Sequence, residues 1–221
     1  MSTGYDIFRS QLDEAVEVFP SLSKVLSGGK DILRGTIAVV DGDGRYWEDY
    51  EVEIVASDGF PNEFPHLFEI SGKIPRIGDW HIYEDTGSCC VKIKPEELIR
   101  CKGGITVREY IAEEVLPYLF NQTHRKVEGY YINGEYSHGG VGIYEFYAGV
   151  LRTRNNIELT IWLMRYIAGN DRPGRTSTCF CGSGEKFRNC HREAYDKLSV
   201  LERDTLEVHA NQISLLVGRM V

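Results

Sequence analysis

The sequence has little positive charge and no long apolar segment. Its 221 residues contain 25 Lys and Arg against 33 Asp and Glu, which gives a net charge of -8 and a pI near 5.3. No cluster of Lys and Arg is dense enough to follow a phosphate backbone, so we expect no nucleic-acid partner. No apolar run reaches the roughly 18 residues that a membrane span needs, so we also expect no membrane partner.

Two further absences concern targeting and nucleotide chemistry. The segment Met1–Phe8 lacks the basic and apolar regions of a signal peptide, and we therefore expect a cytoplasmic protein. No Gly-x-x-x-x-Gly-Lys loop is present, so any ATP-dependent activation of a carboxyl group is expected on another protein. In a reducing compartment the six cysteines are expected to be free thiols or metal ligands rather than disulfides.

A dense group of metal-binding side chains lies near the C-terminus. Cys179, Cys181, Cys190 and His191 surround a Gly-Ser-Gly turn. Thiolates and imidazole suit tetrahedral zinc, and the two glycines allow the backbone to fold back so that all four side chains meet one ion. We predict a structural zinc site here, with a loop of free thiols as the alternative.

This run resembles the SEC-C motif, the zinc-binding motif at the end of the SecA translocase that is found as an appendix on many bacterial proteins. The ligands of that family match the same four positions. The resemblance covers a small part of the chain and implies a docking module rather than a reaction, so the function has to be sought upstream.

Hydrophobic patterning predicts an α+β fold for the upstream part. Apolar residues at helical spacing predict a helix over residues 5–19 that Pro20 ends. Alternating apolar residues and turn signals predict an antiparallel meander of three strands, at residues 32–40, 46–55 and 67–70. After an irregular stretch, Thr106 is expected to cap a long helix that contains Pro117.

The remainder is predicted to be helical apart from the metal motif. Helices are expected over residues 142–152 and 156–167, and a closing helix from about residue 191 to 216. Residues 169–174 are typical of a linker. We therefore predict two domains, one over residues 1–168 with the meander and a helical extension, and one over residues 175–221 with the zinc motif and the closing helix.

The segment Trp80–Val91 carries the residues of greatest chemical interest outside the zinc motif. It contains His81 and the adjacent pair Cys89 and Cys90, and it is expected to be a loop between the meander and the capped helix. Loops held by a rigid scaffold are common sites of reactive, partly exposed thiols. Two buried structural thiols are the alternative interpretation.

The order of elements around this segment resembles a ubiquitin-conjugating enzyme. The resemblance covers about Tyr5 to Gln122, and Phe60–Pro65 matches the proline-rich turn of that family. His81–Tyr83 stands where the family has His-Pro-Asn, and Gly87–Val91 aligns with its Gly-x-Ile-Cys-Leu run. The resemblance implies a ubiquitin-conjugating-enzyme-like fold with Cys90 as the residue that accepts an acyl group as a thioester.

The roles of three further residues remain open from the sequence. Tyr83 replaces the family asparagine that steadies the oxyanion, and its phenol offers a hydrogen-bond donor instead. His81 either orients the loop or assists proton transfer. Cys101 is a second candidate nucleophile because Arg100 and Lys102 flank it and favour a thiolate.

The chain departs from the eukaryotic pattern in the tripeptide His81–Tyr83, and in this it resembles the bacterial conjugating enzymes of antiphage defence operons. That likeness implies that an activating enzyme transfers a partner protein to Cys90 through the exposed C-terminal tail of the partner. The partner is either a ubiquitin-like protein or a cyclic-nucleotide synthase. Structural zinc is the one cofactor expected. Two alternatives stay open: a non-catalytic adaptor that binds a ubiquitin-like tail through the same fold, and a cysteine hydrolase that uses Cys90 with His81 or His138.

Overall fold

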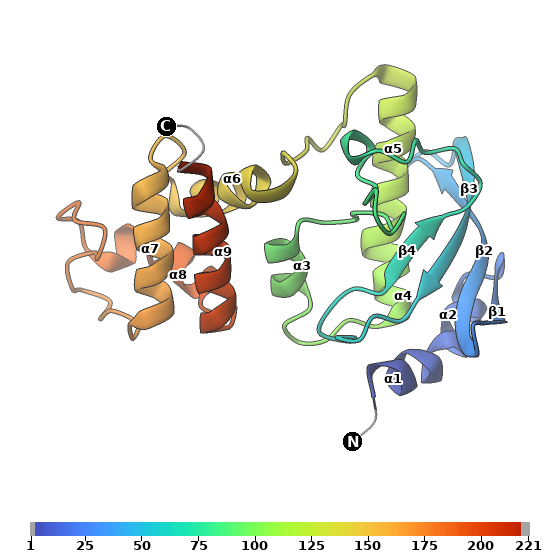
Figure 1. Ribbon diagram of the computed structural model, residues 1–221, viewed down its shortest axis with the longest axis horizontal. Helices are drawn as coiled ribbons and strands as arrows, with labels where there is room; N and C mark the ends of the chain where they lie inside the picture. Colours follow the sequence, from blue (N-terminus) through green and yellow to red (C-terminus); the bar gives the residue numbers. More distant parts are fainter. Residues whose placement is uncertain (1–2, 218–221) are drawn as a thin grey trace. The chain divides into compact units, whose positions relative to one another are not determined.

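The computed structural model describes residues 3–217, which divide into two compact units (Figure 1). The first, here the sheet unit, contains the chain up to Lys92 together with Gly103–Glu135. The second, here the helical unit, contains Ile93–Lys102 and the chain from Tyr136 onward. Each unit has its own core and is described by itself.

The sheet unit is built on a four-stranded antiparallel sheet in the order β1-β2-β3-β4. Its strands are β1 (Leu22–Ser27), β2 (Lys30–Val40), β3 (Tyr46–Val55) and β4 (His66–Glu69). The three predicted strands are present, and β1 is a fourth that the pattern did not predict. A two-residue turn at Gly28 and Gly29, with φ angles of 56° and 78°, joins β1 to β2, because glycine adopts these angles without strain.

Helices at both ends of this unit complete its core. The predicted helix over 5–19 is two short helices, α1 (Gly4–Ser10) and α2 (Leu12–Val18), which meet at Gln11. The Gln11 side chain accepts a hydrogen bond from the Val107 amide at 2.9 Å, which ties this junction to the start of the later helix. Phe8 and Leu12 are fully buried, so both short helices contribute to one core.

The long helix predicted after Thr106 is present. Thr106 and Glu109 form a capping box at its start. The helix runs through α4 (Val107–Glu109), a π-helical stretch (Tyr110–Val115) and α5 (Leu116–Glu128), and α5 packs on β2 and β3. The π-helical stretch ends two residues before Pro117, whose ring nitrogen has no proton to donate to the turn before it.

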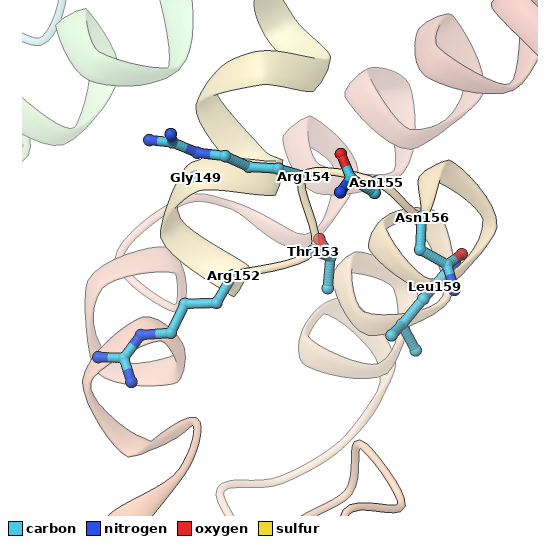
Figure 2. A pocket seen from close by; sticks show the side chains of 7 residues that line it. All are labelled: Gly149, Arg152, Thr153, Arg154, Asn155, Asn156 and Leu159. Carbon is cyan, nitrogen blue, oxygen red and sulfur yellow. The ribbon is translucent and has the colours of Figure 1, made fainter.

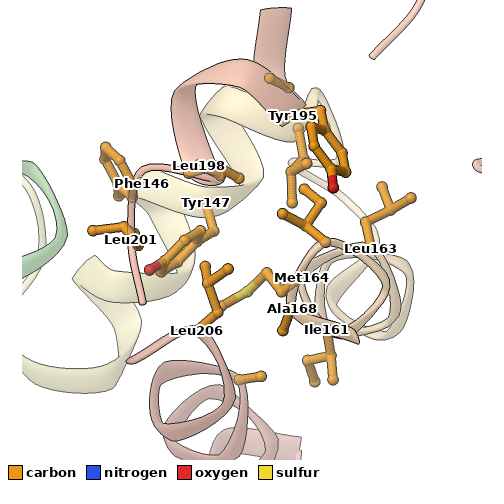
Figure 3. Close-up of a cluster of buried hydrophobic side chains, with 14 of the residues drawn as sticks. Phe146, Tyr147, Ile161, Leu163, Met164, Ala168, Tyr195, Leu198, Leu201 and Leu206 are labelled. Atoms are coloured by element: carbon orange, nitrogen blue, oxygen red, sulfur yellow. The ribbon is translucent and has the colours of Figure 1, made fainter. Parts of the chain in front are cut away.

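The helical unit contains α3 (Lys94–Arg100), α6 (Gly139–Leu151), α7 (Ile157–Gly169), α8 (Arg192–Leu198) and α9 (Arg203–Val217). Figure 3 shows the buried side chains that these helices share, among them Phe146, Met164 and Leu206. The expected single closing helix is interrupted between α8 and α9, and α3 lies in a stretch that was predicted to be irregular.

The two units divide the chain differently from the predicted domains. Residues 136–168, assigned above to the first domain, belong to the helical unit together with the metal motif. The reason is that the apolar faces of α6 and α7 are buried against α9 and against residues of the metal loop such as Phe187. Residues 169–174 therefore connect two parts of one core.

Candidate functional site

The loop between α7 and α8 brings the four predicted metal ligands together. An isolated bridge pairs Thr178 with Lys186, and the Cys179 amide donates to the Glu185 carbonyl at 2.8 Å. Gly182 and Gly184 within this turn have φ angles of 78° and 80°. Phe187 is fully buried at the base of the loop and anchors it to the helical core.

The ligand atoms of Cys179, Cys181, Cys190 and His191 all lie within 4.8 Å of one another. Sγ of Cys181 is 3.5 Å from Sγ of Cys190, and Nδ1 of His191 is 3.5 Å from Sγ of Cys179 and 3.1 Å from Sγ of Cys190. Zinc bond lengths of about 2.3 Å to sulfur and 2.0 Å to nitrogen give tetrahedron edges of roughly 3.5–3.8 Å. The donor set and its spacing therefore fit a metal ion such as zinc.

The orientation of His191 is fixed from the other side of its ring. Nε2 lies 2.9 Å from the carbonyl oxygen of Leu151, the last residue of α6. A carbonyl oxygen only accepts, so Nε2 carries the proton and Nδ1 presents its lone pair to the thiols. Metal-ligating histidines usually donate their second ring N–H in this way, and the contact supports the site as a metal centre.

The thiols of this cluster have unequal proton affinities. Burial and hydrogen bonding within the cluster raise the pKa of Cys190 to about 11. Burial also acts on Cys181, but hydrogen bonds from Ser183 and from neighbouring thiols outweigh it and lower the pKa of Cys181 to about 6. The cluster thus already favours one thiolate, and a bound cation would remove the remaining thiol protons.

His81 and Cys90 lie opposite each other in a short hairpin of the sheet unit. An isolated antiparallel bridge pairs Ile82 with Cys89, the Cys90 amide donates to the His81 carbonyl at 2.7 Å, and the Tyr83 amide donates to Ser88 at 2.9 Å. The structure therefore brings His81, Tyr83 and Cys90, which were selected from the sequence, onto one hairpin.

The three cysteines outside the metal cluster differ in accessibility. Cys89 is 7% exposed, and burial raises the pKa of its thiol to about 12, so it is protonated at neutral pH. Cys101 is fully buried at the end of α3 and belongs to the helical unit. Cys90 is partly exposed, which makes it the thiol of these three that a protein partner can reach.

Two residues near the hairpin were not identified from the sequence. Oε2 of Glu135 lies 3.1 Å from Nε2 of His81. Arg125 donates to Asp79, and its guanidinium carbon lies 4.4 Å from the Trp80 ring centroid, which anchors the start of the hairpin to α5. Glu135 and Arg125 follow Cys90 by tens of residues, and no local pattern connects them with the hairpin.

A cavity of about 580 Å³ lies at the connection between α6 and α7 (Figure 2). Arg152 and Arg154 extend from it in the same general direction, away from Asn156 and Leu159. The Asn156 side chain accepts from the Leu159 amide at 2.9 Å and caps α7. Its oxygen is therefore used by the fold, and we assign no ligand to this cavity.

Comparisons with known proteins bear on one of these features. The SEC-C motif family matches residues 175–193, which include all four metal ligands, so this loop carries a SEC-C motif. The comparison with curated proteins gave no match, and neither did the comparison with solved structures. Among the residues that the structure describes, no helix has the length and apolar character needed to cross a membrane.

Proposed function

We propose that the chain is a ubiquitin-conjugating-type acyltransferase of bacterial antiphage defence, in which Cys90 accepts the C-terminus of a partner protein as a thioester. The observation that carries this proposal is the position of Cys90. It is the partly exposed thiol on a hairpin opposite His81, after an antiparallel meander and before a long helix. That order of elements is the one on which the resemblance to conjugating enzymes rests.

The chemistry proceeds in two acyl transfers. The Cys90 thiolate attacks the acyl carbon of a thioester on an activating enzyme, so that a new C–S bond forms and the thiolate of that enzyme leaves. An amine then attacks the Cys90 thioester, a C–N bond forms, the C–S bond breaks, and the amine proton is released. Cys90 returns to its starting form, and the chain itself needs no nucleotide.

Two side chains of the hairpin are assigned supporting roles. His81 holds the loop through its carbonyl, which accepts from the Cys90 amide at 2.7 Å, and its imidazole is proposed to assist proton transfer. The Tyr83 side chain is half exposed beside the same loop, and its phenol is proposed to stabilise the oxyanion in place of an asparagine amide.

The metal motif is proposed to dock partners, whereas chemistry takes place in the sheet unit. Zinc at Cys179, Cys181, Cys190 and His191 would fix the loop and supply no reaction step, since all four positions around the ion are occupied by protein. The proposed partner is a ubiquitin-like protein or a cyclic-nucleotide synthase with a free C-terminal tail, in the cytoplasm.

The experiment for this proposal is intact-mass analysis of the chain expressed with an activating enzyme and a ubiquitin-like protein encoded beside it. A thiol-sensitive adduct on wild type that is lost in Cys90→Ala supports the proposal, and Cys101→Ala is the matched control that retains the adduct. If activity in cells survives Cys90→Ala and no adduct forms, the chain is a non-catalytic adaptor that binds the tail through the same fold.

A further inference from the structure

Two of the three thiols in the metal cluster are accessible, whereas the third is buried. Cys181 and Cys190 are partly exposed, and Cys179 is 3% exposed. Residues 182–186, which follow Cys181 in the turn of the loop, are all exposed. The oxidation of a thiolate depends on its exposure, so a small oxidant in solution reaches Cys181 and Cys190 before Cys179.

The two accessible thiols are also close enough to form a disulfide. The Sγ atoms of Cys181 and Cys190 are 3.5 Å apart. A disulfide bond is about 2.05 Å long, so the two atoms need to approach each other by roughly 1.5 Å. They lie on the two arms of the loop, and the turn between the arms contains Gly182 and Gly184. Glycine changes its backbone angles at little cost, which allows the arms to close by this distance.

The buried thiol is a poorer partner for either of the other two. Cys179 and Cys181 are separated only by Phe180, whose ring stacks on Tyr166 of α7 at a centroid distance of 4.4 Å and an interplanar angle of 4°. A disulfide requires a specific separation and orientation of the two Cβ atoms, so a bond across this single residue would disturb the stacked ring. The structure therefore favours a bond between Cys181 and Cys190.

We propose that the metal loop is a redox switch in which a peroxide joins Cys181 to Cys190 and removes both from the metal site. One thiolate attacks the peroxide, an S–O bond forms, the O–O bond breaks, and the hydroxide that leaves takes a proton to become water. The second thiolate attacks the sulfenic sulfur, the S–S bond forms, the S–O bond breaks, and a second water leaves in the same way. The two sulfur atoms together supply the two electrons that reduce the peroxide.

The disulfide changes the loop while the core beneath it keeps its anchors. Cys179 and His191 remain as donors, too few for a structural site, which uses four protein ligands, so the metal is released. Phe187 is fully buried at the base of the loop, and Nε2 of His191 keeps its contact with the Leu151 carbonyl at 2.9 Å. The disulfide then links the two arms in place of the metal. The switch acts on the exposed surface of the loop, and its purpose rests on the proposed docking role of this motif.

The test is oxidation of the full chain with zinc bound, followed with a chromophoric zinc chelator and by mapping of disulfide-linked peptides. We expect hydrogen peroxide to release about one zinc per chain while a link between Cys181 and Cys190 appears. A thiol reductant with added zinc should restore both the free thiols and the metal content, because a disulfide is reversible and higher oxidation states of sulfur are not.

Cys190→His is the informative variant. Two cysteines and two histidines are a common donor set for zinc, so the variant should bind metal, but Cys181 lacks the thiol with which it pairs. We expect peroxide to release zinc from this variant about tenfold more slowly than from wild type. The matched control combines Cys89→Ala, Cys90→Ala and Cys101→Ala, which removes the cysteines outside the cluster, and it should release zinc at the wild-type rate.

Three results would overturn the inference: zinc that stays bound until the protein unfolds, zinc release without a link between Cys181 and Cys190, or equal release from Cys190→His and wild type. The peptide map of wild type decides the matter even if Cys190→His binds no zinc. The proposed function fails separately, through the absence of a thioester adduct on Cys90, and that result leaves the release of zinc by peroxide unchanged.

Discussion

The imidazole of His191 donates from Nε2 to the carbonyl oxygen of Leu151 at 2.9 Å. Leu151 ends α6, and the last carbonyls of a helix have no partner within the helix. One histidine therefore faces the thiol cluster with Nδ1 and completes the end of α6 with Nε2. This links the metal loop to the core of the helical unit.

This double role gives a prediction for His191→Cys. A fourth thiolate keeps a tetrahedral donor set, so the variant should still bind about one zinc per chain. The Leu151 carbonyl loses its donor, and we expect the helical unit to lose about 1–3 kcal/mol of stability. Zinc content by elemental analysis and chemical denaturation of the metal-bound protein measure the two effects. Unchanged stability would show that the contact with Leu151 contributes nothing.

Cys181→Ser should release the metal and destabilise the helical unit as a whole. The ligand loop is packed against α6 and α7 through Phe187, and binding energy at structural zinc sites contributes directly to folding. Elemental analysis and hydrogen exchange across α6 to α9 give the measurement. Cys90→Ser, the same chemical change in the sheet unit, is the control and should retain metal. Retention of zinc by Cys181→Ser would mean that the ligand set is wrong.

Phe187→Ala should cost the helical unit about 3–5 kcal/mol, because it leaves a cavity where a fully buried ring contacts Tyr195 and Phe180. The melting temperature of the metal-bound protein measures the loss. Leu215→Ala in α9 is the control, since Leu215 is 68% exposed and should change stability by less than about 0.5 kcal/mol. Equal effects of the two substitutions would contradict the assigned core.

We expect the helical unit to lose stability in mild acid because His209 takes up a proton on unfolding. Burial and the charge of Lys94 lower the pKa of His209 below its ordinary value of 6.5, and Nδ1 of the ring shares a hydrogen bond with the Tyr147 hydroxyl at 2.7 Å. The unfolded chain therefore binds a proton at higher pH than the folded one. Stability is full above pH 6.5 and declines as the pH falls below it.

Thermal unfolding as a function of pH checks this expectation. His209→Gln should lower stability at neutral pH but flatten its decline in acid, whereas replacement of the exposed His66 by glutamine should leave the wild-type slope. The same slope in all three proteins would show that His209 does not titrate on unfolding.

The features predicted correctly from the sequence are those encoded by neighbouring residues. The four metal ligands lie within one short run, and the Thr106 cap has Glu109 three residues later. On either side of the turn at 41–44, β2 is rich in apolar β-branched residues, and β3 alternates between apolar and polar side chains from Tyr50 to Ile54. Spacing alone determines such local structures, so no knowledge of the tertiary fold was needed.

The features that were missed depend on tertiary contacts. The apolar residues of β1 do not alternate with polar ones, and the strand forms because its backbone pairs with β2. Helices α6 and α7 were assigned to the first domain because nothing local shows which core buries their apolar faces. Glu135 lies 54 residues from His81 in the sequence, and the fold alone places it at the imidazole.

The central claim is that Cys90 carries an acyl group, and the most direct measurement is the mass of the serine variants. Cys90→Ser and Cys101→Ser are each expressed with the neighbouring genes, denatured and weighed, since serine retains a transferred acyl group as a more durable ester. We predict an adduct with the mass of a partner protein on the serine at position 90, while Cys101→Ser behaves as wild type. An adduct on the serine at position 101, or none on either variant or on wild type, would contradict the account.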